Sequence, residues 1–170
     1  MYGRRMDAVQ PTRGRPIAPD LYPFPDDPRR WLPWSHVDQR LRDAPNYWLA
    51  TAGPTGVPHA TPVWGVWVDG ALYFDGPPTT RWARNLAANP RLTVHLESGE
   101  DVVIIEGVAE DLVTDDGLAE RIVSAWNAKY GRLAPEPSTT GLFRLRPNTA
   151  RAWSRSSLED GTRWILREGS

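Results

Sequence analysis

A strand, a tight turn and a second strand can be read in the run HATPVWGVWVDGALYFD, which occupies residues 59–75. Asp69 and Gly70 stand between two segments rich in β-branched and aromatic residues, and this placement is a strong signal for a two-residue β-hairpin. Pro62 lies inside the first segment. Because proline has no N–H to donate, we expect this strand at a sheet edge, or beside a neighbour whose backbone stays free.

Further short strands are expected on both sides of this hairpin, over 47–51, 92–96, 102–113, 142–146, 149–153 and 163–166, with an irregularity at Gly107. Helices are expected from Ser35, from Thr79 or Thr80 to Pro90, and from Thr114 to Gly131. Six to seven strands at hairpin spacing, with two to three inserted helices, predict a mainly β fold built on an antiparallel barrel.

Residues 1–33 differ in composition from the rest of the chain. They carry seven of the 17 prolines and show no apolar periodicity, which predicts an extended or disordered segment ahead of a barrel domain over 34–170. No apolar stretch is long enough for a signal peptide or a membrane span. We therefore expect a cytoplasmic protein that does not contact a membrane.

Composition narrows the possible chemistry. With 20 basic and 21 acidic residues the formal charge is -1, so nucleic acid is not an expected partner. The chain has no cysteine, and His36, His59 and His95 are too far apart to suggest a metal site. Lys129 is the only lysine. Because it has no carboxylate or histidine neighbour in the sequence, amine catalysis is not expected there.

The run PTTRWARNLAANP at 78–90 carries the clearest sign of a ligand. Arg81 and Arg84 stand in the first turn of the expected helix, where the helix dipole disfavours cations, and no acidic residue accompanies them. A bound phosphate would compensate, since free N–H groups, a hydroxyl of Thr79 or Thr80 and two guanidinium groups would all face it. Alternatively, both arginines point into water or pair with a distant aspartate.

The aromatic residues of the first strand also allow two interpretations. A flat ring can approach a strand whose backbone is interrupted at Pro62, or Trp64 and Trp67 simply cover the two faces of a barrel strand. No catalytic residue is assigned. If a general acid exists, His59 and Tyr73 are the candidates, and solvent could replace them.

The segment 47–96 resembles the pyridoxamine 5′-phosphate oxidase-like flavin and deazaflavin oxidoreductases, through its LAT strand, GxP turn, HATPVW strand, DG hairpin and RNLAANPR helix. FRLRP at 143–147, followed by Ala152 and Trp153, is similar to the closing strands of that family. The resemblance covers about residues 36–166. It implies a split β-barrel of the FMN-binding type, assembled as a homodimer with two cofactor sites at the interface.

The resemblance also implies which residues contact the cofactor. Those along its ring would be Thr61, Pro62, Val63 and Trp64. Those at its phosphate would be Thr80 and Arg81, at the helix start that includes Thr79, with support from Arg84 and Asn85. Those that reach the cofactor from the partner chain would be Trp153 and Arg163.

Two departures from the family pattern bear on the reaction. The substrate-binding RLH run is replaced by Leu158-Glu159-Asp160-Gly161, and the lysine at the helix start is Trp82, so pyridoxamine-phosphate oxidation is not expected. The arginine-rich composition resembles actinobacterial members, which often use coenzyme F-420. The implied function is hydride transfer between reduced F-420 and a conjugated small molecule such as a quinone, enone or tetrapyrrole. The alternatives are an FMN-dependent oxidase or reductase of the same fold, or a non-catalytic protein that binds flavin, F-420 or a tetrapyrrole.

Overall fold

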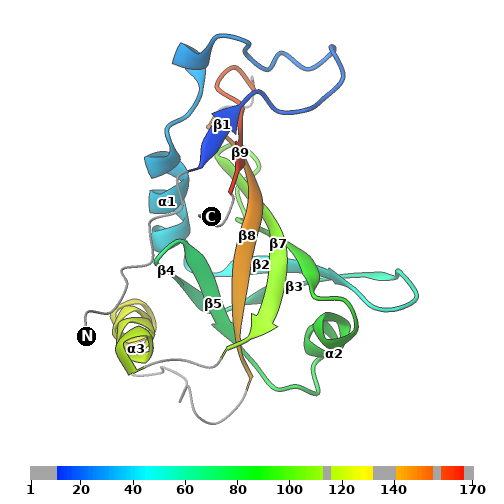
Figure 1. The fold of residues 1–170 in the computed structure, drawn as a ribbon, viewed down its shortest axis with the longest axis vertical. Coiled ribbons are helices and arrows are strands. Elements are labelled where there is room, and N and C mark those ends of the chain that lie inside the picture. Colours follow the sequence, from blue (N-terminus) through cyan, green and yellow to red (C-terminus); the bar gives the residue numbers. More distant parts are fainter. Residues whose placement is uncertain (1–10, 113–115, 132–140, 155–157, 167–170) are drawn as a thin grey trace, which may run out of the picture.

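The computed structural model describes residues 11–112, 116–131, 141–154 and 158–166, which form nine strands and three α-helices around one curved antiparallel sheet (Figure 1). The strands are β1 (Thr12–Gly14), β2 (Tyr47–Ala52), β3 (Pro58–Val63), β4 (Gly65–Val68), β5 (Ala71–Asp75), β6 (Arg91–His95), β7 (Val102–Asp111), β8 (Leu142–Trp153) and β9 (Thr162–Ile165). The helices are η1 (Pro28–Arg30, a 3-10 turn), α1 (Trp34–Asp43), α2 (Arg81–Ala88) and α3 (Asp116–Tyr130).

Strand β8 organises the sheet. The hydrogen-bonded order is β1-β9-β8-β7-β6-β2-β3, and β5, which carries β4, pairs with the first residues of β8 while β9 pairs with the last ones. All described pairings are antiparallel. The mainly β, antiparallel fold class expected from the sequence is therefore confirmed.

The structure confirms three features that were predicted from short stretches of the sequence. Asp69 and Gly70 both have positive φ (50° and 76°), as a type I′ hairpin turn requires between β4 and β5. Within the described residues β3 pairs only with β2, so Pro62 does lie in an edge strand. The register of β7 shifts between Glu106 and Gly107, where a Cβ on the glycine would lie 2.0 Å from the carbonyl oxygen of Arg146.

Other boundaries differ from the sequence expectation. The run 59–68 is broken at Trp64 into β3 and β4, whereas 142–146 and 149–153 form one strand. Strand β1 was not expected, because its three residues have no strand signal and, in the described part of the chain, pair only with β9. Helix α1 begins at Trp34 after Pro33 and has no side-chain cap, so Ser35 is not its cap. Thr114 lies outside the described residues.

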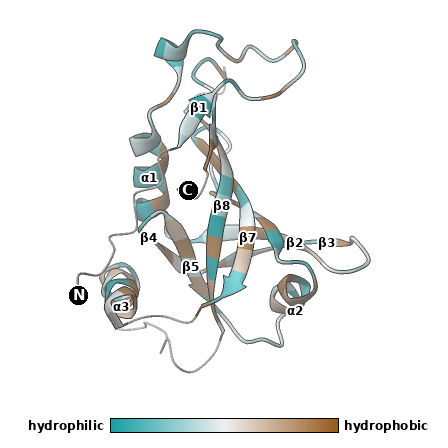
Figure 2. Cartoon of the chain, viewed as in Figure 1, coloured by the Kyte–Doolittle hydropathy of each residue, from teal (hydrophilic) through white to brown (hydrophobic). Residues whose placement is uncertain are grey.

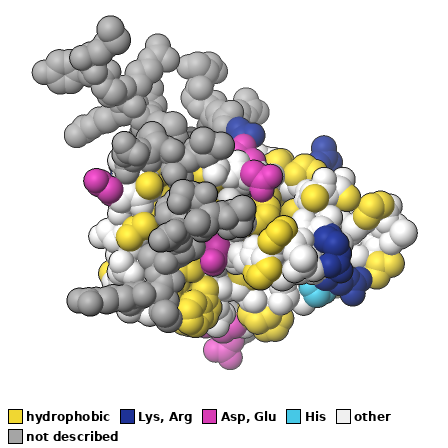
Figure 3. Space-filling view, turned by 90° about the horizontal axis from the view of Figure 1, so that it is seen from below, with side chains coloured by type: hydrophobic (Ala, Val, Ile, Leu, Met, Phe, Trp, Pro, Cys, Tyr) yellow, Lys and Arg dark blue, Asp and Glu magenta, His cyan; other side chains and the backbone are white. Residues whose placement is uncertain are grey.

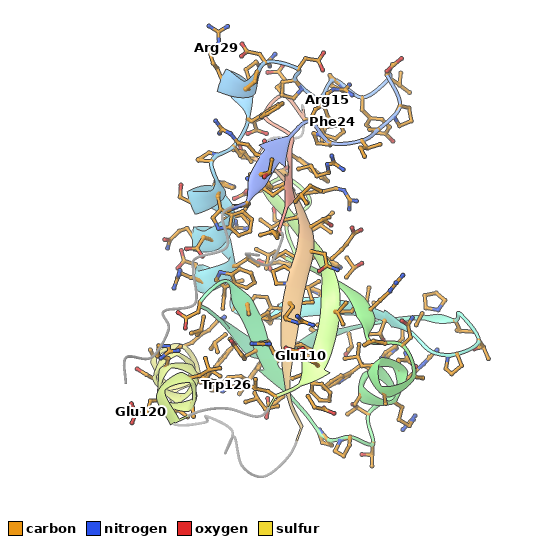
Figure 4. All side chains as sticks on the ribbon, viewed as in Figure 1. Arg15, Phe24, Arg29, Glu110, Glu120 and Trp126 are labelled. Carbon is orange, nitrogen blue, oxygen red and sulfur yellow. The ribbon has the colours of Figure 1, made fainter. Side chains whose placement is uncertain are left out.

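Two apolar clusters hold these elements together. The larger fills the barrel and takes in Leu41 of α1 and Leu86 of α2. The smaller lies between α3 and the β4–β5 hairpin, where Trp126 points from α3 toward β5 (Figure 4). Hydropathy follows this division, since β4 and β5 are largely apolar while the end of β7 is hydrophilic (Figure 2). Among the described helices, none combines the length and apolar character needed to cross a membrane.

The described part of the N-terminal segment, residues 11–33, projects beyond the barrel at the β1–β9 end (Figure 1). Its loop is closed by Arg15, whose Nε donates to the carbonyl oxygen of Phe24 (3.2 Å) and pairs with Asp26 (3.1 Å; Figure 4). Residues 11–33 are thus mostly extended, with only β1 and η1 as regular elements. A domain boundary at residue 33 stays a prediction.

Candidate functional site

The start of α2 has the features expected of an anion site. The Thr80 hydroxyl caps the helix by accepting from the backbone N–H of Ala83 (3.3 Å), and the first turn contains no acidic residue. Arg81 is exposed, and Arg84 is exposed and donates to the carbonyl oxygen of Thr79. In the part of the chain that the structure describes, neither guanidinium forms an ion pair. Pairing with a distant aspartate, one of the two alternatives left open by the sequence, is therefore not found there.

This donor set fits a phosphate group. The N–H groups of the first turn of a helix have no partner within the helix, and the helix dipole adds partial positive charge at the same place. Seen from below, Lys and Arg side chains gather on the side of the molecule where α2 lies in Figure 1 (Figure 3). The start of α2 can thus hold an anion through backbone, hydroxyl and guanidinium donors together.

Asn85 fixes α2 against the sheet. It is buried (8% exposed), and its Nδ2 donates to the hydroxyl of Thr51 in β2 at 3.0 Å. Gly53 leaves room for it, because a Cβ there would lie 2.8 Å from the Asn85 Oδ1. The structure therefore places Asn85 as a link between α2 and β2, behind the helix start.

Three of the four residues expected along the ring, Thr61, Pro62 and Val63, lie in β3, the open edge strand, which packs beside α2. They do not share one face. Val63 is opposite the core residue Tyr47 and is buried, Thr61 follows the same side by strand alternation, and Pro62 faces the other way. Only the edge of the strand, with its unpaired backbone, is common to both sides. A flat ligand would therefore meet β3 along this edge.

Trp64 lies at the bend between β3 and β4 and is 50% exposed. Its indole stacks on the ring of Tyr130 in α3, with centroids 4.8 Å apart and planes only 5° apart. One face of the indole is therefore covered by α3. The other face is not stacked on any ring of the described residues.

Trp153 and Arg163 do not lie beside the other predicted residues in this chain. Trp153 ends β8, which is separated from the β3 edge by β7, β6 and β2, and Arg163 lies in β9, one strand further away. There Trp153 contacts Phe24 edge-on (6.4 Å), and the buried Nε of Arg163 has no hydrogen-bond partner among the described residues. One chain does not bring the two groups together, so their contact with a cofactor in the partner chain stays a prediction.

Neither candidate general acid occupies a clear catalytic position. Tyr73 is 2% exposed in the cluster under α3, and burial raises the pKa of its hydroxyl. It cannot touch a ligand at the β3 edge. His59 lies in β3 opposite Thr51 and is half-buried, which places it on the α2 side of the hairpin.

Sequence reasoning missed a polar cluster beneath Trp64. Lys129 Nζ donates to the Tyr47 hydroxyl (3.0 Å) and to the carbonyl oxygen of Gly65 (3.0 Å), and burial lowers the pKa of Lys129 to about 8. Its partners are 82 and 64 residues away in the chain, so no local pattern could have revealed them. A second missed pair, Trp48 and His95, stacks at 6.2 Å beside Pro62, and strand register alone would have found it.

A hollow of about 540 Å³ lies at the surface between α3 and β4. Its lining includes Arg42, Trp67, Glu120 and Arg121. None of the residues predicted to bind a cofactor contributes to it, so it is separate from the α2 start and the β3 edge.

The antiparallel barrel, in which the start of α2 can bind an anion beside the edge strand β3, places this chain among the split β-barrel proteins. A family model described as pyridoxamine 5′-phosphate oxidase matches residues 34–154, and the chain belongs to that family. No curated protein gives a significant match.

Solved structures show the same fold. A conserved hypothetical protein from Mycobacterium tuberculosis is 26% identical, with a TM-score of 0.61, over 75% of this chain and 88% of that one. A heme binding protein from Mycobacterium smegmatis is 23% identical (TM-score 0.59) over 74% of this chain and 56% of that one. An F-420 reductase is 23% identical (TM-score 0.50) over 66% of this chain and 94% of that one.

Proposed function

We propose that this protein is an oxidoreductase that transfers a hydride between reduced coenzyme F-420 and a conjugated small molecule such as a quinone, enone or tetrapyrrole. The observation that carries the proposal is the exposed start of α2, where Thr80, Arg81 and Arg84 offer phosphate donors beside the open β3 edge. Membership of the pyridoxamine 5′-phosphate oxidase family supports a redox cofactor, and the fold shared with an F-420 reductase supports this choice.

Each part of the site has a distinct task in this proposal. Arg81, the first-turn N–H groups and the Thr80 hydroxyl bind the phosphorylated side arm, and Arg84 adds positive charge. The β3 edge orients the ring so that one face stays open to substrate. A second copy of the chain completes the site with Trp153 and Arg163, whose buried Nε has no hydrogen-bond partner among the residues that the structure describes.

F-420, when bound, supplies the hydride chemistry, and the protein supplies orientation and a dry site. This division explains why the helix start and the strand edge carry binding groups and no paired acid and base. A proton that the substrate requires comes from solvent or from His59. We further propose a cytoplasmic homodimer in which residues 34–170 form the catalytic unit.

FMN is the alternative cofactor, because the same donors at α2 would bind its phosphate equally well. The protein would then be an oxidase or a flavin reductase of the same fold. A non-catalytic protein that binds a flavin, F-420 or a tetrapyrrole is the third possibility, and the shared fold with a heme binding protein supports it.

Parallel binding titrations test the proposal. Purified protein is titrated with F-420 and with FMN, and cofactor fluorescence reports binding. F-420 should bind more tightly, and Arg81→Ala should weaken binding by about 1.5–3 kcal/mol, as expected for loss of a charged hydrogen bond. Arg91→Ala is the matched control, since Arg91 is also exposed but begins β6, outside the helix start.

A turnover assay distinguishes an oxidoreductase from a protein that only binds the cofactor. Reduced F-420 should be oxidised on addition of at least one member of a panel of quinones, enones and tetrapyrroles. Tight binding without turnover would favour the non-catalytic alternative, and absence of binding to both cofactors would refute the proposal.

A further inference from the structure

Two side chains at the end of α3 form hydrogen bonds with the backbone of Gly65, at the bend between β3 and β4. Its carbonyl oxygen accepts from Lys129 Nζ (3.0 Å) and lies 2.9 Å from the Tyr130 hydroxyl oxygen. Its N–H donates to the same hydroxyl at 3.1 Å. Side chains of α3 therefore bind both polar groups of this peptide residue, and they do so where the edge strand leaves its partner.

The same two side chains tie the bend to the α1–β2 junction. The Tyr130 hydroxyl lies 2.8 Å from the carbonyl oxygen of Pro45, to which it can donate. Lys129 Nζ donates to the Tyr47 hydroxyl, which in turn donates to the carbonyl oxygen of Leu41 at 2.5 Å. The ammonium group also lies over the Tyr47 ring, 4.5 Å from its centroid. The bend is thus fixed from two directions.

Trp64 immediately precedes this held residue. Its indole lies flat on Tyr130, and Tyr130 in turn packs against the buried Trp126 with ring centroids 5.4 Å apart. A short series of aromatic contacts therefore runs from the buried Trp126, whose ring is tilted by 54° to that of Tyr130, outward to the half-exposed indole of Trp64. Tryptophan offers a large rigid surface on which a second flat ring can stack.

We propose that Lys129 and Tyr130 are positioning residues for Trp64, holding the free face of its indole at the end of the open β3 edge, where it receives a flat conjugated ring. The identity of that ring, a flavin or a deazaflavin, rests on the proposed function. The positioning of Trp64 by α3 does not. Lys129 and Tyr130 act through Trp64 and Gly65 and need not touch the ligand themselves.

The charge on Lys129 makes this arrangement sensitive to pH. Burial lowers the pKa of Lys129 to about 8, and Asp43 at the end of α1 opposes part of that shift. The other groups at the ammonium are Tyr47 and Tyr130, which it contacts; Arg42, which lines the same surface hollow as Lys129, is paired with Asp38 (2.9 Å). Burial raises the pKa of both tyrosines, so neither ionises near pH 8. Between pH 7 and 9, Lys129 is therefore the group in this cluster that changes charge.

Fluorine NMR of protein labelled with 5-fluorotryptophan tests the positioning without any ligand. Trp64→Phe identifies the Trp64 resonance among the nine tryptophans. We expect this resonance to shift between pH 7 and 9 in the wild-type protein. The shift should disappear in Lys129→Arg, which keeps a permanent positive charge, and in Lys129→Met. Tyr130→Phe, which keeps the stack and loses the hydroxyl bonds, should move the resonance at every pH.

Arg121→Gln is the matched control, because Arg121 also lies on α3 but pairs with Asp69 (2.9 Å) at the surface. It should leave the Trp64 resonance and its pH response unchanged. Folding of each variant is verified by the positions of the other resonances, apart from that of Trp126, which packs against Tyr130. A Trp64 signal that ignores pH in the wild type, and that is identical in Lys129→Met and Tyr130→Phe, would overturn the proposal.

A second measurement connects the positioning to the ligand. Riboflavin has the ring of FMN without the phosphate, so the two ligands separate the ring contact from the phosphate contact. Trp64→Leu should weaken both by about tenfold, the upper range for an aromatic stacking contact. Tyr130→Phe and Lys129→Met should weaken both by a common, smaller factor, whereas Arg81→Ala should affect FMN alone. Failure of the wild type to bind any flavin or deazaflavin would refute the proposed function, while the NMR result would still decide the positioning.

Discussion

The bond between Asn85 and Thr51 is the most direct structural support for the position of α2, and its energetic value can be measured. Asn85→Leu removes the donor and leaves the Thr51 hydroxyl, on a residue that is 4% exposed, without its partner. An unsatisfied buried polar group costs about 1–3 kcal/mol. We therefore expect a loss of about 2 kcal/mol in the free energy of unfolding, or roughly 4–8 °C in Tm for a chain of this length.

A double-mutant cycle shows whether this cost comes from the bond. Thr51→Val alone should leave Asn85 without its acceptor and should also destabilise the protein. The double variant replaces both partners by apolar groups of similar shape, so it should lie within about 1 kcal/mol of the wild type. Equilibrium urea unfolding, followed by tryptophan fluorescence, gives all four free energies. If the double variant loses the sum of the two single effects, the bond does not couple α2 to β2 and the reasoning is refuted.

Three further predictions concern stability. Gly107→Ala should destabilise the protein by about 3 kcal/mol in urea unfolding, because the added Cβ would meet the carbonyl oxygen of Arg146 at 2.0 Å. A hydrogen bond from Arg151 lowers the pKa of the Glu106 carboxyl in the folded protein. The ionised carboxylate therefore stabilises the fold above the ordinary carboxyl pKa, and this stabilisation is lost as the pH falls through the pKa of the folded state. The urea midpoint should accordingly vary less between pH 3 and 6 in Glu106→Gln than in the wild type. Because the pKa of Lys129 falls from 10.5 to about 8, the unfolded chain binds more protons between these values, and the free energy of unfolding should rise from pH 8 to 9.5 in the wild type but not in Lys129→Met.

Features set by adjacent residues could be predicted from the sequence. The β4–β5 turn follows from the backbone preferences of Asp69 and Gly70, and the end of α3 follows from Gly131, whose φ is +70°. The edge position of β3 follows from the missing N–H of Pro62. The Thr80 cap and the cations at the start of α2 are also local signals, and the structure confirms the cap, whereas the phosphate site stays a prediction.

Features that depend on distant contacts could not be predicted. The break at Trp64 lies next to hydrogen bonds between Gly65 and Tyr130, which are 65 residues apart. Strand β1 is defined by its pairing with β9, about 150 residues further along the chain, for example Thr12 with Ile165. Lys129 has no carboxylate or histidine neighbour in the sequence, and its lowered pKa arises from burial against Tyr47 and Gly65 once the chain has folded. A periodic pattern of residues carries no information on such pairings.

A crystal structure of the protein grown with an excess of F-420 or FMN tests the central claim most directly. We predict the phosphate at the start of α2, within about 3 Å of the Arg81 guanidinium and the Thr80 hydroxyl, as charge-assisted hydrogen bonds require, with the ring along the β3 edge. A cofactor bound instead in the hollow between α3 and β4, or an acidic side chain seated on the α2 start, would contradict the account.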